Sequence, residues 1–262
     1  MAVGDDIGNW FLINASPDLP AQIGSCSDLH PHPNTLRCSL ISGVLLTNAD
    51  LDHVLGLFSL REGGRLNVHA TRAVRNTLDE CLGLTSVMSA FCGVDWHEPP
   101  EGDFVTIIGN NGKQSNLTYR AIRLHGGPPL FSRSARPDDV HSIAYHIVDR
   151  KTGGRLLVAP DVARCNKALT DAMEDSDAIF FDGTFWSDDE LLQIKTNGKK
   201  AAEMGHLPIK DFMLQLGSFT AKHKIYIHLN NTNPVLSRDS QERAAVESAG
   251  IRVGQDGMEF NL

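Results

Sequence analysis

The sequence predicts an α/β fold in which two sheets are sandwiched between helices, and two features indicate it. Short apolar runs of strand length first follow one another and later alternate with stretches of helical spacing. Several of these runs also end in an acid or a histidine, at the strand ends where ligands usually bind in sheet-based domains. The chain has 262 residues, 41% of them hydrophobic, and we expect a single domain over residues 1-262.

Each expected element rests on the length and spacing of its apolar residues. Apolar runs that are too short for an independent helix predict strands at 9–15, 40–46, 66–70, 104–108, 117–124, 142–148, 155–159, 178–182, 224–228 and 251–253. Helical spacing predicts helices at 53–58, 71–82, 167–173, 209–216 and 240–248. A further helix is expected after the capping turn Ser16-Pro17-Asp18.

Composition and charge exclude several classes of protein. The net charge of -8 and the pI near 5.7 argue against nucleic acid or an anionic membrane as a partner. No stretch approaches the ~20 apolar residues of a membrane span, and the acidic start at residues 1–6 does not resemble a signal peptide. Five cysteines at scattered spacings predict no disulfide framework. We therefore expect a cytoplasmic protein.

The run from Thr47 to His53 is the most informative motif, because an acid and an imidazole stand side by side at a strand end. Adjacent residues cannot share one face of a helix or strand, but at a turn Asp52 and His53 can both bend toward one ion. A turn whose side chains bond their own backbone is the alternative. The remaining strand ends favour the metal site.

Four other strand ends carry a candidate residue, and each has a structural alternative. His228 and His125 are candidate ligands, although a strand-end histidine is often structural and a loop histidine is often exposed. Asp161 is placed to cap the helix that follows it, and Asp182 to form a turn. Because strand ends gather along one edge of a sheet, all four are candidates for one site.

Loop residues supply further candidates. His206, in Glu203-Met204-Gly205-His206-Leu207, is a candidate for proton transfer, since imidazole titrates near neutral pH; a local hydrogen bond at a helix entry is the alternative. The amide of Asn230 is a candidate for supporting a ligand by hydrogen bonding, or for simple turn chemistry. The acidic run 187–190 predicts a solvated turn or a helix start.

These residues resemble the metallo-β-lactamase superfamily, whose signature is Thr-His-x-His-x-Asp-His after a buried strand. Here Asn48 and Asp50 replace two of the histidines. More narrowly, the chain resembles the family of protein B of pyrroloquinoline quinone (PQQ) biosynthesis. The strings that carry this resemblance are Asn14-Ala15-Ser16-Pro17-Asp18, Asp182-Gly183-Thr184, Glu203-Met204-Gly205-His206-Leu207 and Asn230-Asn231-Thr232-Asn233-Pro234.

The resemblance implies a fold, and the sequence departs from the family pattern at its start. We expect a four-layer αββα metallo-β-lactamase-like sandwich that lacks part of its first sheet, because the family's first strand and cysteine cluster have no counterpart here. The structural zinc that those cysteines hold in the family is therefore expected to be absent.

The resemblance also implies a chemistry. One divalent metal, with Fe(II) favoured and Zn(II) an alternative, would be held by Asp52, His53 and His228, the two-histidine, one-carboxylate set of non-haem iron oxygenases. The expected activity is hydroxylation of a tyrosine-derived PQQ precursor, a small molecule or modified peptide, with His206 orienting or deprotonating the phenol.

Alternatives to this chemistry stay open. A second metal is conceivable through Asp50, His125 and Asp161, which would suit a zinc-dependent hydrolase. A carrier that assists transport of PQQ or its precursor to the periplasm is another alternative. The sequence also leaves open a homodimer.

Overall fold

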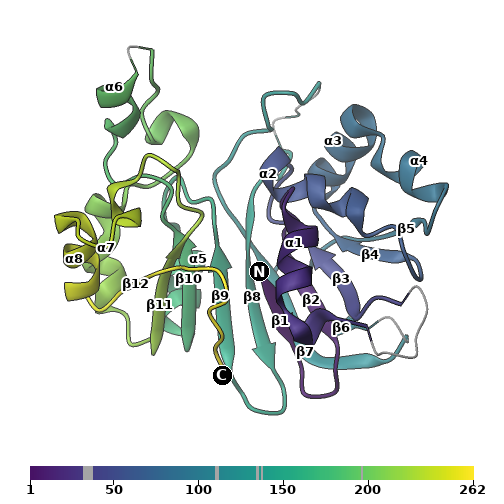
Figure 1. Cartoon of the computed structure of the whole chain (residues 1–262). Coiled ribbons are helices and arrows are strands. Elements are labelled where there is room, and N and C mark those ends of the chain that lie inside the picture. The colour runs from purple at the N-terminus through teal and green to yellow at the C-terminus, as the bar shows by residue number, and fades with distance from the viewer. Residues whose placement is uncertain (32–37, 110–111, 134–135, 137, 196) are drawn as a thin grey trace. The chain divides into compact units, whose positions relative to one another are not determined.

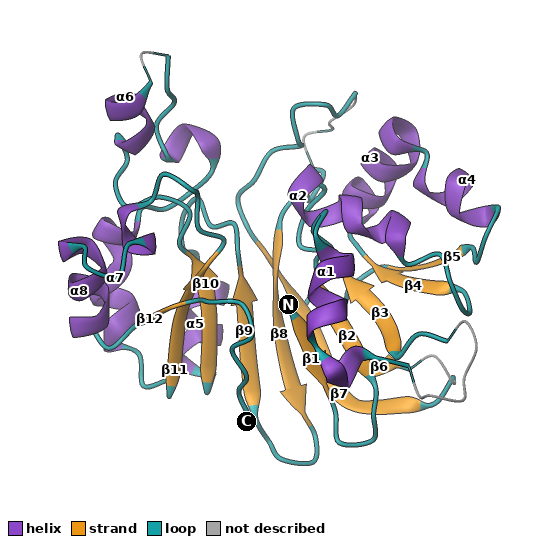
Figure 2. Cartoon of the chain, viewed as in Figure 1, coloured by secondary structure: helices purple, strands orange, loops and turns teal. Residues whose placement is uncertain are grey.

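The computed structural model describes residues 1–31, 38–109, 112–133, 136, 138–195 and 197–262. Its contacts group the chain into two compact units. Unit 1 comprises residues 1–120 and 128–141, and unit 2 comprises residues 121–127 and 142–262. The described strands form one five-stranded and one seven-stranded sheet, and Figures 1 and 2 show the helices that accompany the strands of each unit. The expected single domain over residues 1-262 stays a prediction.

Unit 1 is built on a mainly parallel sheet with the strand order β1-β2-β3-β4-β5. Only the β1–β2 pair is antiparallel among these described strands. The strands are β1 (Ala2–Gly4), β2 (Trp10–Ile13), β3 (Ile41–Leu45), β4 (Leu66–His69) and β5 (Val94–His97), followed by the antiparallel pair β6 (Val105–Ile108) and β7 (Gln114–Arg123). The helices are α1 (Leu19–Ser25), η1 (Ser27–Leu29), α2 (Leu51–Val54), η2 (Leu55–Ser59), α3 (Arg72–Leu82) and α4 (Leu84–Ser89).

Unit 2 contains the strand order β12-β11-β10-β9-β8, in which only β8 and β9 pair antiparallel among the described strands. Its strands are β8 (Ile143–Asp149), β9 (Arg155–Ala159), β10 (Ala178–Asp182), β11 (His223–Ile227) and β12 (Arg252–Val253). Its helices are α5 (Lys167–Glu174), α6 (Glu190–Ile194), η3 (Ala202–Met204), α7 (Ile209–Ser218), η4 (Pro234–Leu236) and α8 (Gln241–Ser248).

Each unit has its own hydrophobic core. In unit 1, Val44, Val68 and Leu78 are among the fully buried residues, so β3 and β4 pack against α3. In unit 2, Phe181 of β10 stacks on Phe212 of α7 with ring centroids 4.9 Å apart. Burying such side chains stabilises each unit by about 1.5–3 kcal/mol per large apolar residue. These cores fix the strand ends on which the candidate residues lie.

The strands and helices predicted from apolar runs are confirmed. The elements that were not predicted are β1, β5, α4 and the short helices η1, η3 and η4. The expected cap by Asp161 is wrong: α5 begins at Lys167 and is capped by Asn166, whose side chain accepts from the backbone N–H of Leu169. The acidic run 187–190 leads into a helix start, as one of its two interpretations predicts, because α6 begins at Glu190. The solvated alternative is wrong for Glu190, which is 6% exposed.

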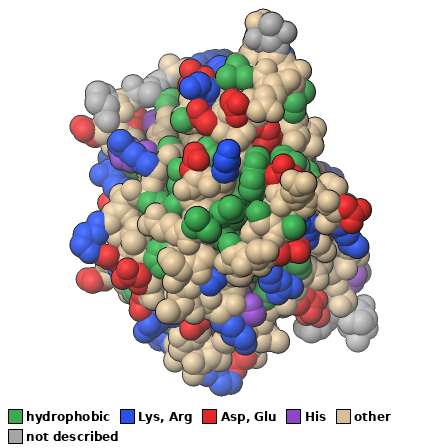
Figure 3. All heavy atoms as spheres, turned by 90° about the vertical axis from the view of Figure 1, so that its left-hand side faces the viewer, with side chains coloured by type: hydrophobic (Ala, Val, Ile, Leu, Met, Phe, Trp, Pro, Cys, Tyr) green, Lys and Arg blue, Asp and Glu red, His purple; other side chains and the backbone are tan. Residues whose placement is uncertain are grey.

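The surface of unit 2 is mixed in character. Figure 3 shows the side on which α6, α7 and α8 lie, where apolar side chains gather near the centre among charged ones. Within the described residues, no helix has the length and apolar character needed to cross a bilayer.

Candidate metal-binding site

Asp52 and His53 lie together at the turn that follows β3. α2 begins one residue before Asp52, and the His53 Nε2 atom lies 3.8 Å from an oxygen of Asp52. His53 is buried, whereas the side chain of Asp52 is 63% exposed. The sequence therefore brings an imidazole nitrogen and a carboxylate into reach of one ion within unit 1.

The ring of His53 is oriented by Asn48. The Nδ1 atom of His53 lies 2.8 Å from Asn48 Oδ1, which also accepts from the backbone N–H of Asp50. Because the amide oxygen can only accept, Nδ1 carries the hydrogen of this bond. Metal-binding histidines are usually held in this way by an acceptor on the other ring nitrogen. The donor set of this turn thus fits a divalent ion.

The segment after β2 is hydrogen-bonded to this turn. The Ala15 N–H donates to the His53 carbonyl at 2.6 Å, and the Gly56 N–H donates to the Ala15 carbonyl at 2.9 Å. Asn14, at φ 59, accepts from the backbone N–H of Thr47. The glycine is required, since a Cβ at position 56 would lie 2.2 Å from the Ser16 carbonyl oxygen.

We expect Gly56→Ala to destabilise the protein by about 1–3 kcal/mol, because the added methyl group must push two backbone segments apart. Urea denaturation measures this change. Gly64→Ala is the matched control in the same unit, since a Cβ there meets nothing within 4 Å. Equal stability of the two variants would show that the turn adapts to the methyl group.

His228 follows β11 and has a left-handed backbone, with φ 59. Such a conformation costs a non-glycine residue roughly 1–3 kcal/mol and persists where the surroundings determine it. Its Nδ1 atom lies 2.7 Å from the Thr184 hydroxyl oxygen. That hydroxyl donates its single hydrogen to Asp182 Oδ1 at 2.7 Å, so it must accept from His228 Nδ1. The ring of His228 is therefore held through its Nδ1 atom, as the ring of His53 is.

Asp182 is a buried hydrogen-bond centre under this site. Its Oδ1 accepts from the backbone N–H and the hydroxyl of Thr184, and its Oδ2 accepts from the Val162 N–H at 2.9 Å and His206 Nδ1 at 2.8 Å. The side chain is fully buried. One carboxylate thus holds the rings of His206 and, through Thr184, of His228. Burial would lower the pKa of His206, but the hydrogen bond and charge of Asp182 outweigh it and raise that pKa.

Asp161, His206 and His228 form a cluster within unit 2. Potential ligand atoms of the three lie within 4.8 Å of one another, and Asp161 Oδ1 is 3.8 Å from His228 Nδ1. The two imidazole rings are 5.6 Å apart between centroids. Two imidazoles and a carboxylate at this spacing also fit a divalent ion.

The other predicted site residues have separate surroundings. His125 is exposed, and its Nδ1 lies 2.9 Å from the Arg164 guanidinium. Asp50 precedes α2 without a side-chain cap bond. The Asn230 side chain donates to the Thr232 hydroxyl at 2.6 Å. Asp52 and His53 belong to unit 1 and His228 to unit 2, so their meeting around one ion stays a prediction, as does a second metal held by Asp50, His125 and Asp161.

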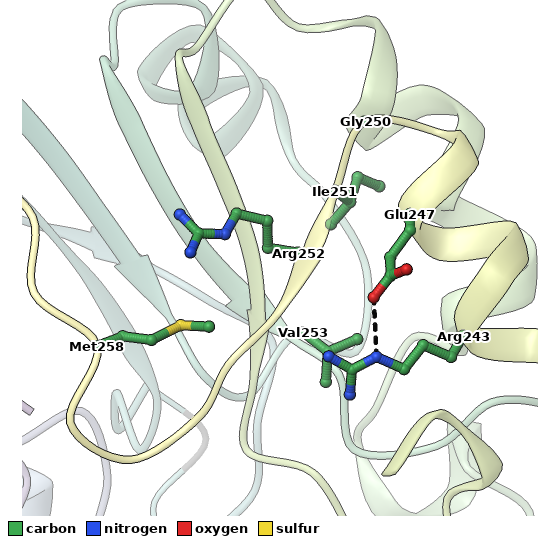
Figure 4. A pocket seen from close by; sticks show the side chains of 7 residues that line it. All are labelled: Arg243, Glu247, Gly250, Ile251, Arg252, Val253 and Met258. Atoms are coloured by element: carbon green, nitrogen blue, oxygen red, sulfur yellow. Dashed lines mark hydrogen bonds and ion pairs between the residues drawn. The ribbon is translucent and has the colours of Figure 1, made fainter. Parts of the chain in front are cut away.

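A separate pocket of about 430 Å³ lies in unit 2 and contains none of these candidates. It is lined by Arg243, Glu247, Gly250, Ile251, Arg252, Val253 and Met258 (Figure 4). The Arg243 guanidinium is paired with Glu247 at 2.9 Å. Its one carboxylate, Glu247, is taken up by this ion pair, and no histidine lines the pocket, so the clustered histidines are the better candidate site.

Sequence reasoning missed Thr184 and Glu190. Thr184 joins Asp182 to His228, and the signal was present in Asp182-Gly183-Thr184, since an acid two residues before a hydroxyl forms such a turn. Glu190 accepts a hydrogen bond from Thr232 in the loop after His228. Its position in an acidic run concealed this contact.

Comparison with known proteins places this site in a family. The family model described as "Beta-lactamase superfamily domain" matches residues 9–229. The chain therefore belongs to the β-lactamase superfamily. Full-length relatives narrow this class further. A protein from Cupriavidus necator is 37% identical over 100% of this chain and 86% of its own, and one from Klebsiella pneumoniae is 35% identical over 99% and 84%. Both are named coenzyme PQQ synthesis protein B, and this chain belongs to that family.

Solved structures agree. The Zn²⁺-bound PqqB of Methylobacterium extorquens matches with a TM-score of 0.87 and 32% identity, over 100% of this chain and 86% of that one. A diphosphatase of the PhnP family, at 16% identity and a TM-score of 0.65 over 98% of this chain and 80% of that one, shares the fold alone. The predicted α/β fold of the metallo-β-lactamase type, with two sheets, is confirmed. The Zn²⁺-bound relative and the clustered ligands support a divalent-metal site.

Proposed function

We propose that the chain acts in PQQ biosynthesis as a mononuclear Fe(II)-dependent hydroxylase of a tyrosine-derived precursor. The observation that carries the proposal is the support of two candidate histidines. His53 and His228 each have Nδ1 bonded to a protein acceptor, the arrangement in which metal-binding histidines are usually held. With Asp52 they make up the two-histidine, one-carboxylate set. The family relatives named for PQQ synthesis support the pathway.

A single ion is favoured by the surroundings of Asn48. In the superfamily signature this position carries an imidazole, whereas here the amide oxygen is already bound to His53 Nδ1 and to the Asp50 N–H. Asn48 therefore supports His53 instead of binding an ion of its own. This arrangement weakens the first of the two sites that a dinuclear hydrolase needs.

His206 is suited to move a proton at the phenol of the substrate. Bound Fe(II) would supply the redox chemistry with oxygen. The hydrogen of His206 Nδ1 is directed to Asp182, so Nε2 can accept the phenolic proton. The Asp182 carboxylate stabilises the imidazolium that forms, as the raised pKa of His206 indicates. This residue would thus orient the substrate and act as its base.

A zinc-dependent hydrolase is the second candidate, and Asp161 favours it. Its carboxylate clusters with His206 and His228, and a carboxylate close to two imidazoles suits a hydrolytic metal site. Such an enzyme would act with Zn(II) on ester, lactam or phosphodiester substrates. The PQQ precursor as substrate, the cytoplasmic location and a homodimer stay predictions under either candidate.

Anaerobic titration with Fe(II), followed by oxygen uptake with tyrosine-type substrates, tests the proposal. We expect one equivalent of Fe(II) to bind, Asp52→Ala to abolish binding, and oxygen uptake to require both iron and substrate. Turnover of esters or phosphodiesters with Zn(II), without oxygen uptake, would support the hydrolase. Tight binding of PQQ without turnover and without effect of chelators would instead indicate a carrier.

A further inference from the structure

Glu190 is a buried carboxylate that joins two segments of unit 2. It is the first residue of α6 and is 6% exposed. One of its oxygens accepts from the Trp186 N–H at 2.6 Å, and the other accepts from the Thr232 hydroxyl at 2.5 Å. A buried charge is costly unless its oxygens are satisfied. The two short bonds therefore mark a specific contact between the start of α6 and the loop of Thr232.

The loop that Glu190 holds begins directly after His228. Thr232 also accepts from the Asn230 side chain at 2.6 Å, and the Asn230 N–H donates to the Thr184 carbonyl at 3.1 Å. The Asn233 side chain donates to the Gly183 carbonyl at 2.8 Å. These bonds tie the loop to the segment that carries Thr184, the hydroxyl that orients the His228 ring.

The loop contacts explain how His228 keeps its left-handed backbone. On one side, β11 pairs with β10, and the Gly183 N–H donates to the Ile227 carbonyl at 2.8 Å. On the other side, the loop is held through Thr232 by Glu190. A strained residue persists when both flanks are fixed. Release of one flank would let the backbone of His228 relax and its ring turn.

The segment that begins at Trp186 also leads to His206. The Ala201 N–H donates to the Asp188 carbonyl at 2.9 Å, and the His206 N–H donates to the Ala201 carbonyl at 3.0 Å. The turn at Asp188 is closed beside Glu190, whose N–H donates to the Ser187 carbonyl at 3.3 Å. Glu190 thus contacts the loop after His228 through Thr232, and it lies two residues from Asp188, whose carbonyl holds the segment that leads to His206.

We propose that Glu190 is a positioning residue that holds the loop after His228, through Thr232, and so fixes the His228 ring for metal binding. The proposal rests on the metal role proposed for His228. A carboxylate is needed because both oxygens accept. Glutamine has only one acceptor oxygen. Its NH₂ group would either face the Trp186 N–H, so that two donors oppose each other, or face Thr232, so that the hydroxyl loses its acceptor.

Zinc affinity at 25 °C, measured by competition with a chromophoric chelator, tests this. We expect Glu190→Gln and Thr232→Val each to weaken Zn(II) binding about tenfold, as loss of a support to a ligand typically does. The double variant should be no weaker than the weaker single variant, because the two side chains act through one bond. Thr232→Ser keeps the hydroxyl and should restore wild-type affinity.

Glu203→Gln is the matched control. Glu203 is exposed and lies in the same segment between Glu190 and His206. Its carboxylate accepts from the Lys200 N–H at 2.9 Å. We expect its zinc affinity to equal that of the wild type. A lowered unfolding midpoint of Glu190→Gln with unchanged zinc affinity would overturn the proposal, since Glu190 would then be merely structural. If Glu190→Gln does not fold, the Thr232→Val and Thr232→Ser pair gives the same decision.

Hydrogen exchange of the metal-free protein separates this proposal from the proposed function. We expect Glu190→Gln to speed exchange at the amides of Asn230 and Asn233, which donate to the carbonyls of Thr184 and Asn230 respectively. Unchanged exchange there would overturn the positioning role. Faster exchange, combined with zinc binding that survives His228→Asn, would mean that Glu190 holds the loop but that the metal assignment of His228 is wrong.

Discussion

Replacing His228 by asparagine is expected to weaken Zn(II) binding by at least about 100-fold, more than the loss of a supporting residue would. The substitution removes the imidazole that Thr184 orients through Nδ1. Asparagine is the matched choice, because it tolerates the left-handed backbone at φ 59 better than alanine does. Isothermal titration calorimetry of the metal-free protein measures the change.

The same substitution should abolish the stabilisation of the folded protein by zinc. A ligand that binds the folded chain at 100 times its dissociation constant adds about 2.7 kcal/mol to the free energy of unfolding. We expect zinc to raise the unfolding midpoint of the wild type but not of His228→Asn. His125→Asn is the control, since that exposed ring contacts Arg164. An equal loss in both variants would contradict a single-ion site and favour a second metal.

Strands with continuous apolar runs were predicted from the sequence, whereas β5, whose apolar and polar residues alternate over only four positions, was missed. In Val94-Asp95-Trp96-His97, alternate residues are polar, and their partners come from β4 and the residue before it. Asp95 pairs with Arg65 at 2.7 Å and His97 with Asn67 at 3.0 Å. These contacts compensate for the missing apolar residues. Each contact joins residues 30 positions apart, so the contacts cannot be predicted from the local sequence.

In the candidate site too, features that depend on neighbouring residues could be predicted, whereas features that depend on contacts between distant residues could not. The strand ends at Asp52, Asp182 and His228 could be predicted, because each follows an apolar run. The left-handed backbone of His228 and the burial of Glu190 could not, since both depend on a hydrogen bond from Thr232 across forty-two residues. An acidic run gives the same local signal whether its last carboxylate is solvated or buried.

Replacing Asp182 by asparagine is expected to reduce turnover of the proposed reaction by about 10²–10⁴-fold, the contribution typical of a general base. Asp182 accepts from donors on both oxygens, and an amide nitrogen cannot accept. If the nitrogen faces His206, the ring must accept at Nδ1 and carry its hydrogen on Nε2. His206 could then no longer take a proton from the phenol. A buried donor left without its acceptor also costs about 1–3 kcal/mol of stability.

The pH dependence should change in a defined direction. The folded state raises the pKa of His206 above its ordinary value of 6.5. Protonated His206 therefore stabilises the fold fully below that value, and this stabilisation is lost as the pH rises through the folded-state pKa. Without the carboxylate, burial remains and lowers the pKa. We expect Asp182→Asn to lose the stabilisation on the acid side.

NMR titration of the His206 ring protons and unfolding midpoints across pH 5–9 measure the two effects. The chosen range spans the ordinary pKa of imidazole. Asp189→Asn is the control, because this exposed carboxylate bonds only Ser187 and Gln193 among the side chains described and should leave the His206 titration unchanged. A His206 pKa that is equal in wild type and Asp182→Asn would show that the carboxylate does not set the basicity of the ring. The proton transfer assigned to His206 would then lose its physical basis, whereas the metal role of His228 would stand on its own evidence.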